Sequence, residues 1–158
     1  MKSKIGIIGF GNIAKAIITP LLDKKLINPD QIYCLVNSKK SLENIKKNYK
    51  YNINVFQVNS EYSNLVWDCQ VKLLSVKPQH LQEINEIYNH KIKDNLLISI
   101  LAGVSIEKLN YKFPNHNCVR VVTNIPIKVG KGLTGIAWDK KILENQKKLT
   151  KELFASSS

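Results

Sequence analysis

The residues best suited to chemistry in this sequence are the glycines of the segment Gly9-Phe10-Gly11-Asn12-Ile13-Ala14. An isoleucine-rich stretch precedes the segment and a helical pattern follows it. This order is the Gly-x-Gly-x-x-Ala fingerprint of a strand–turn–helix unit that binds the pyrophosphate of a dinucleotide. Gly9 permits the tight turn, Gly11 lets the backbone approach the pyrophosphate, and Ala14 lets the helix pack closely on the strand. Free N–H groups at the helix start would hold the phosphates.

The end of the second predicted strand indicates which dinucleotide is bound. An Asp or Glu there would bind the ribose 2′-hydroxyl of NAD. Asn37 takes that place, and no acidic residue occurs between Asp30 and Glu43. Ser38 can donate a hydrogen bond, and Lys39 and Lys40 add positive charge, which favours NADP(H), with NAD(H) as the alternative. Ser38 could also cap the next helix while the two lysines remain solvated.

Strands and helices alternate along the chain, which predicts an α/β fold with a Rossmann-type, doubly wound, mostly parallel sheet. We assign residues 1–154 to one NAD(P)-binding domain and 155–158 to a polar tail. Pro20 should kink or end the regular part of the first helix. The predicted strands are Lys4–Ile8, Ile32–Val36, Asn54–Gln57, Val71–Val76, Leu96–Ile100, Cys118–Val122 and Leu133–Trp138. The predicted helices are Asn12–Lys24, Ser41–Lys50, Ser60–Trp67, Gln79–His90, Ser105–Leu109 and Lys140–Phe154.

Ligands of such sheets lie outside the carboxyl ends of the strands. Three further strand ends should therefore meet near the nicotinamide: Ser75-Val76-Lys77-Pro78-Gln79, Ala102-Gly103-Val104-Ser105, and Arg120 to Pro126. Lys77 could hold a ribose hydroxyl or a phosphate, or could be a surface lysine before a helix. Gly103 would permit close backbone approach.

These segments together resemble the N-terminal half of the pyrroline-5-carboxylate reductase family. The matching residues are the glycine segment, Ser75 to Gln79, Ser99 to Ile106, and Arg120 to Pro126 followed by Val129-Gly130-Lys131-Gly132. All four occur in the family's order and approximate spacing over nearly the whole chain.

The resemblance implies hydride transfer from NADPH to 1-pyrroline-5-carboxylate, giving L-proline in proline biosynthesis. It implies cofactor contacts at Ile8, Gly9, Phe10, Gly11, Asn12, Ile13, Ser38, Lys40, Asn59, Ser75, Val76, Lys77, Pro78, Leu101, Ala102, Gly103 and Asn124. Lys39 is a further expected cofactor contact, because its positive charge favours NADP(H). Ile125 departs from the family, which usually has a threonine there, so one hydrogen bond near the nicotinamide is lost.

The family also continues with a helical domain that forms homodimers or larger oligomers and supplies most of the imine pocket. We expect this chain to be the cofactor-binding half, shortened or degenerate, and its catalytic residues are unknown. Alone it should bind NADPH but turn over poorly, because the second reactant is not positioned.

Composition narrows the remaining possibilities. The formal net charge is +12, yet the lysines are scattered without interleaved aromatic residues, so we expect a solvated surface and no nucleic-acid partner. No apolar run is long enough to span a membrane, and no metal-ligand spacing occurs. Cys34, Cys69 and Cys118 are predicted to be free thiols in the cytoplasm. His80, His90 and His116 are expected at the surface.

Two alternatives stay open. The chain could belong to another reductase with the same N-terminal unit, of the β-hydroxyacid or deazaflavin-linked type. It could instead be a stand-alone NADP(H)-binding module without catalysis.

Overall fold

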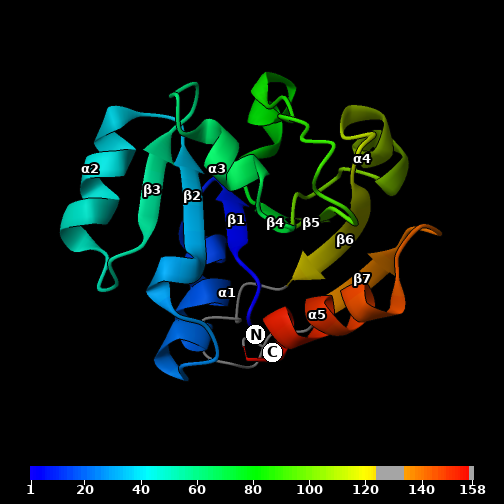
Figure 1. Ribbon diagram of the computed structural model, residues 1–158, viewed down its shortest axis with the longest axis horizontal. Coiled ribbons are helices and arrows are strands. Elements are labelled where there is room, and N and C mark those ends of the chain that lie inside the picture. The colour runs from blue at the N-terminus through cyan, green and yellow to red at the C-terminus, as the bar shows by residue number, and fades with distance from the viewer. Residues whose placement is uncertain (124–133, 157–158) are drawn as a thin grey trace.

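The computed structural model describes residues 1–123 and 134–156. In these residues seven strands form one sheet in the order β3-β2-β1-β4-β5-β6-β7 (Figure 1). All neighbouring pairs are parallel except β6 and β7, which are antiparallel. The strands are β1 (Ile5–Ile8), β2 (Ile32–Val36), β3 (Asn54–Gln57), β4 (Val71–Leu74), β5 (Leu96–Ser99), β6 (Asn117–Thr123) and β7 (Thr134–Trp138). The predicted mostly parallel, doubly wound sheet is confirmed.

Helices cover both faces of the sheet because the central strands are apolar on both sides. One hydrophobic cluster joins Ile5 and Ile7 of β1 to the helices α1 (Asn12–Asp23), α2 (Lys39–Asn48) and α5 (Glu144–Ala155). The other joins Ile8 of β1 to α3 (Ser63–Trp67), the 3-10 helix η2 (Pro78–Glu83) and α4 (Ile106–Lys112). A short 3-10 helix, η1 (Pro29–Gln31), precedes β2.

The sheet order reverses at β1, which is the position that brings ligands to the sheet edge in this class of fold. From β1 the chain winds outward through β2 and β3, and then returns to β4 on the other side of β1. The crevice between these two halves opens at the carboxyl ends of β1, β2 and β4.

Two predicted helices differ markedly from those observed. The helix predicted over Gln79–His90 is wrong: only the 3-10 helix η2 forms, and residues 84–89 have no regular structure. Glu86 there bonds to side chains of another element, which draws the chain away from a helical path. The last helix begins at Glu144 instead of Lys140, because Gln146 Oε1 accepts from the Leu143 N–H at 3.0 Å and so satisfies a free donor at the helix start.

Pro20 does not end α1, which continues to Asp23. Leu21 and Leu22 behind the proline are buried at 0% and 4% exposure, so packing offsets the missing backbone hydrogen bond. None of the helices within the described ranges has the length and apolar character needed to cross a membrane.

Candidate cofactor-binding site

A groove of about 600 Å³ lies at the carboxyl ends of β1, β2 and β4. Its lining residues come from four stretches of the chain that are distant in sequence. They are Ile8, Gly9, Phe10, Gly11, Leu35, Val36, Asn37, Ser38, Ser41, Val58, Asn59, Ser75, Val76, Lys77, His80, Glu83 and Ile84.

The floor of the groove is the turn between β1 and α1. Gly9 has a φ of +87°, and a Cβ atom there would lie 2.7 Å from the Ser75 carbonyl oxygen. Only glycine fits this position without strain. A Cβ atom on Gly11 would meet nothing within 4 Å, so the backbone there faces open space. Ala14 is fully buried in the contact of α1 with the sheet. The three residues thus lie in the predicted order of strand, turn and helix.

The start of α1 provides hydrogen-bond donors for a ligand. Gly11 is the N-cap and provides no side-chain acceptor, and no acidic residue lies in the first turn. The first N–H groups of a helix have no partner within the helix, and the positive end of its dipole attracts anions. Because Gly11 lines the groove, this helix end can hold a phosphate group.

The β2 side of the groove presents polar side chains. Asn37 is exposed at the end of β2. Ser38 caps α2 by accepting from the Ser41 N–H at 3.1 Å, and its hydroxyl donates to Ser41 Oγ at 3.0 Å. Lys39 and Lys40 are exposed in the first turn of α2 but do not line the groove.

The opposite wall is formed by the turn after β4 and by η2. Val76 and Lys77 lie where the sequence placed them. His80 and Glu83 on η2 also line the groove and were not predicted. The His80 ring and the Glu83 carboxylate form a weak pair, with 3.5 Å between His80 Nδ1 and Glu83 Oε2. The sequence did contain a signal for these two residues, because Pro78 is predicted to start a helix directly after β4. The first turns of that helix had to lie beside the groove.

Other predicted residues lie apart from this groove. Leu101, Ala102 and Gly103 follow β5, one strand beyond β4, and do not line it. Gly103 has a φ of +71°, with open space where a Cβ atom would stand. Asn12, Ile13 and Pro78 flank lining residues without lining the groove themselves. Asn124 lies outside the described residues.

A smaller cavity of about 200 Å³ continues from the groove toward α3. The two share Ile8, Leu35, Val58, Asn59, Glu83 and Ile84. Its other lining residues are Ser60, Ser63, Trp67, Asn85, Glu86 and Ile87.

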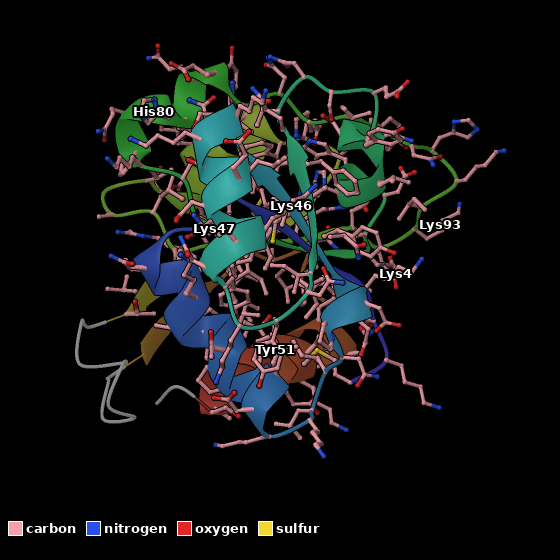
Figure 2. All side chains as sticks on the ribbon, turned by 90° about the vertical axis from the view of Figure 1, so that its left-hand side faces the viewer. Lys4, Lys46, Lys47, Tyr51, His80 and Lys93 are labelled. Carbon is pink, nitrogen blue, oxygen red and sulfur yellow. The ribbon has the colours of Figure 1, made fainter. Side chains whose placement is uncertain are left out.

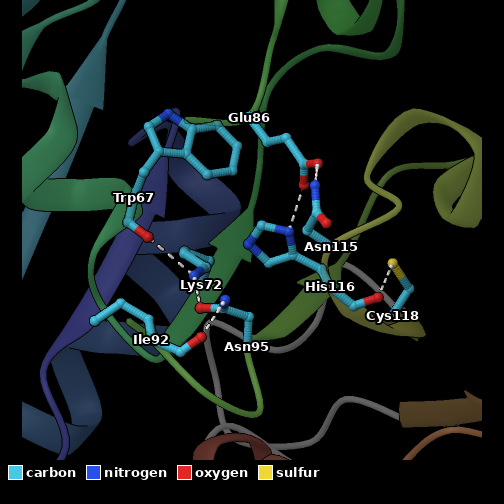
Figure 3. Close-up of polar contacts among 8 residues, drawn as sticks. All are labelled: Trp67, Lys72, Glu86, Ile92, Asn95, Asn115, His116 and Cys118. Atoms are coloured by element: carbon cyan, nitrogen blue, oxygen red, sulfur yellow. Dashed lines mark hydrogen bonds and ion pairs between the residues drawn. The ribbon is translucent and has the colours of Figure 1, made fainter. Parts of the chain in front are cut away.

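A buried lysine lies below this region, on the α3 side of the sheet (Figure 3). Lys72 of β4 has 0% exposure, and its Nζ donates to the Trp67 carbonyl oxygen at 3.1 Å and to Asn95 Oδ1 at 2.8 Å. Burial lowers the pKa of Lys72 to about 8. Gly6 makes room beside it, because a Cβ atom there would lie 2.5 Å from the Val66 carbonyl oxygen and 3.1 Å from Lys72 Cγ.

The expected surface position of His116 is wrong, since it is only 2% exposed. Its ring packs edge-on against Trp67 and Phe113, and its Nδ1 lies 2.6 Å from Glu86 Oε2 (Figure 3). Burial, with the positive charges of Lys72 and Lys141, lowers the pKa of His116 to about 3. The neutral ring therefore donates through Nδ1 to the carboxylate, which can only accept. His90 is exposed and His80 is partly exposed, as expected.

The lysines are spread around the molecule. Figure 2 shows Lys46 and Lys47 on α2, while Lys4 and Lys93 lie elsewhere on the surface, and all four are exposed. Cys34, Cys69 and Cys118 are free and buried.

The model of the family described as coenzyme F420-dependent NADP oxidoreductase matches residues 4–103, which include the glycine turn and the ends of β1 to β5. The chain belongs to this family of oxidoreductases. The matched part contains most of the residues that line the groove.

Curated proteins that are similar in sequence to this chain include pyrroline-5-carboxylate reductases. The enzyme of Synechocystis is 33% identical over 99% of this chain and 57% of its own length. The enzyme of Haemophilus influenzae is 34% identical over 96% of this chain and 54% of its own length. The chain spans about half the length of the curated relatives it matches. The resemblance inferred from the four segments is thus confirmed.

Solved structures of the same kind share the fold. A pyrroline-5-carboxylate reductase from Coxiella burnetii superposes with a TM-score of 0.84 at 24% identity, covering 100% of this chain and 57% of that one. A pyrroline carboxylate reductase of Plasmodium falciparum, solved with NADP bound, gives 0.74 at 23% identity and covers 99% of this chain and 56% of its own.

Proposed function

We propose that residues 1–154 form the NADP(H)-binding domain of a pyrroline-5-carboxylate reductase-type oxidoreductase. The observation that carries the proposal is the groove at the reversal of the sheet order, with Gly9 and Gly11 on its floor and the uncapped start of α1 beside them. The family and the curated relatives support the same assignment.

The residues present fit an adenine dinucleotide phosphate. Backbone N–H groups at the start of α1 would hold the pyrophosphate where the missing Gly11 side chain leaves space. Asn37, Ser38 and Ser41 would surround the adenosine ribose. The end of β2 carries no acidic side chain, and Lys39 and Lys40 are close by on α2, so a 2′-phosphate is favoured over a free hydroxyl.

The remaining site residues are proposed from their positions. Ile8, Phe10, Asn59, Ser75, Val76 and Lys77 line the groove and would contact the cofactor directly. Asn12, Ile13 and Pro78 would contribute through the backbone beside it. Leu101, Ala102 and Gly103 would lie toward the nicotinamide, beyond the β4 end of the groove. Asn124, outside the described residues, is proposed as a cofactor contact from the family resemblance alone.

We propose further that the protein to which this domain belongs reduces 1-pyrroline-5-carboxylate to L-proline. NADPH, when bound, supplies the hydride for the C=N carbon of the imine. The role of the described residues is to bind and orient the cofactor at the carboxyl ends of the strands. Dimer formation, a small imine-acid substrate and a cytoplasmic location belong to the same proposal, and the location agrees with three free, buried thiols.

Titration of the 158-residue chain with NADPH tests the proposal, with the change in nicotinamide fluorescence as the signal. We expect saturable binding of NADPH that is tighter than binding of NADH. If the chain binds neither NADPH nor NADH, the assignment is contradicted. If NADH binds more tightly than NADPH, the choice of cofactor is contradicted.

The alternative of a stand-alone NADP(H)-binding module makes the same prediction for this titration. Proline formation from 1-pyrroline-5-carboxylate by the complete natural protein would separate the two, because the stand-alone module would bind NADPH without forming proline.

A further inference from the structure

One wall of the cofactor groove is formed by His80, Glu83 and Ile84, and it continues into a segment with no regular structure. Residues 84–95, here called the strap, connect η2 to β5. Ile84 at its start lines both the groove and the smaller cavity, and Asn85, Glu86 and Ile87 line the smaller cavity. The position of the strap therefore determines the shape of this wall.

Backbone hydrogen bonds do not hold the first part of the strap to the fold. Within the described residues, Ile84 N donates to Leu81 O, and the next backbone bond inside the strap runs from Ile92 N to Asn89 O. Between them the strap depends on side-chain contacts. The position of the strap is therefore set by the few side chains that bind it to other parts of the chain.

Glu86 makes the contact nearest the cavities. Its Oε2 lies 2.6 Å from His116 Nδ1, and its Oε1 accepts from Asn115 Nδ2 at 2.6 Å (Figure 3). The Glu86 side chain is 11% exposed and that of His116 is 2% exposed. The His116 ring packs against Trp67 and Phe113, whose ring centroids lie 5.8 and 6.4 Å from that of His116. Two short bonds to a charged acceptor in a buried setting form a strong attachment.

Other attachments of the strap lie farther along the chain. Asn89 Nδ2 donates to Asp68 Oδ1 at 3.2 Å, and Gln70 Nε2 donates to the Lys93 carbonyl oxygen at 3.1 Å. Neither Asn89 nor Lys93 lines a cavity. These contacts hold the far part of the strap, whereas Glu86 holds the part beside the groove.

We propose that Glu86 is a positioning residue for the cofactor site, and that its bonds to Asn115 and His116 fix the wall formed by Glu83 and Ile84 against the bound dinucleotide. This rests on the proposed function, because it assumes that the groove binds NADP(H). Glu86 itself does not line the groove. It acts by keeping the free protein in the shape that binds, so that no binding energy is used to order the strap.

Two variants, Glu86→Ala and Glu86→Gln, test whether the hydrogen bonds of Glu86 position the strap. Alanine removes both bonds and frees the strap. Glutamine keeps the side-chain length and accepts from Asn115 through its carbonyl oxygen. Its amide donates to His116 Nδ1 once the ring proton moves to Nε2, which has no hydrogen-bond partner among the described residues. Asn89→Ala is the matched control, because it also removes two strap bonds, to Asp68 Oδ1 and from the Lys91 N–H, but at a place away from both cavities.

Titration with NADPH at neutral pH gives the readout. We expect Glu86→Ala to bind at least about tenfold more weakly than the unmodified chain, which is the order of one charge-assisted hydrogen bond. Glu86→Gln should stay within about threefold and Asn89→Ala should be unchanged, since neither loses an anchor next to the groove. Equal binding by Glu86→Ala, a loss in Glu86→Gln as large as in Glu86→Ala, or an equal loss in Asn89→Ala would each overturn the proposal.

A second measurement needs no variant. Bound NADPH should slow amide hydrogen exchange at residues 84–88 of the unmodified chain, because the wall then has a ligand to pack on. If NADPH binds but exchange there does not change, the positioning proposal is overturned while the proposed function stands. If the unmodified chain binds no NADPH, both fail.

Discussion

A Cβ atom on Gly9 would lie 2.7 Å from the Ser75 carbonyl oxygen, so the turn after β1 and the residue after β4 meet across the reversal of the sheet order. Ser75 N also donates to the Ile8 carbonyl oxygen at 2.9 Å. The contact joins the two halves of the sheet under the groove. It also explains why the two glycines of the fingerprint should respond differently to substitution.

Gly9→Ala is expected to destabilise the fold by about 3 kcal/mol, because alanine is strained at a φ of +87° and has no room beside Ser75. Gly11→Ala should leave the stability within about 0.5 kcal/mol, since φ is −91° and the space is open. The added methyl group would instead occupy the groove and weaken NADPH binding by at least about tenfold. Urea unfolding and NADPH titration of both variants measure the two effects. Normal NADPH affinity in Gly11→Ala would contradict the placement of the pyrophosphate.

Asn37→Asp should reverse the cofactor preference. A carboxylate at the end of β2 would accept from a ribose 2′-hydroxyl and repel a 2′-phosphate. We expect the ratio of NADPH affinity to NADH affinity to fall by at least about tenfold, since two like charges about 4 Å apart near a protein surface repel each other by more than about 1.4 kcal/mol. Asn64→Asp on α3 is the control for added charge, because that residue is exposed and does not line the groove. An unchanged ratio in Asn37→Asp would show that the 2′ position lies elsewhere.

Lys72 should make the stability of the fold rise with pH in the alkaline range. Its pKa is about 8 in the folded chain and 10.5 when unperturbed, so the folded state favours the neutral amine. The cost of burying the charge is present below pH 8 and is relieved as the pH rises toward 10.5, by up to about 3 kcal/mol.

Lys72→Met isolates this effect, because the ionisation of other groups in the unfolded state is common to both proteins. The unmodified chain should gain stability over Lys72→Met between pH 8 and 10, measured by urea unfolding at each pH. A constant difference across that range would show that the Lys72 amine titrates normally despite its burial.

His116 should make the chain less stable in acid. Its pKa is about 3 when folded and 6.5 when unperturbed, so the folded state favours the neutral ring. The contribution is present in full above pH 6.5 and is lost as the pH falls toward 3, which amounts to about 2 kcal/mol at pH 5. His116→Gln cannot titrate and should show a shallower loss between pH 6.5 and 5 in the same unfolding measurement. Parallel curves for the two proteins would contradict the neutral ring.

The sequence determined the parts of this protein that depend on local backbone chemistry. The glycine turn, the helix cap at Ser38 and the alternation of apolar strands with helices follow from which residues tolerate a positive φ, satisfy free N–H groups or are covered on both faces. The strand boundaries were predicted to within about two residues for the same reason. Ser38 capping α2 required only the spacing to Ser41.

Tertiary structure decided what local propensity could not. Residues 84–89 read as helix, yet Glu86 forms its bonds with Asn115 and His116, which lie about 30 residues away in sequence. His116 was expected at the surface, yet its burial and that of Lys72 depend on partners from α3, the strap and the end of α4. Such residues leave water only when every remaining hydrogen bond is supplied by segments that meet after the sheet has formed. For that reason the part of the groove wall formed by His80, Glu83 and Ile84 could be found only in the folded chain.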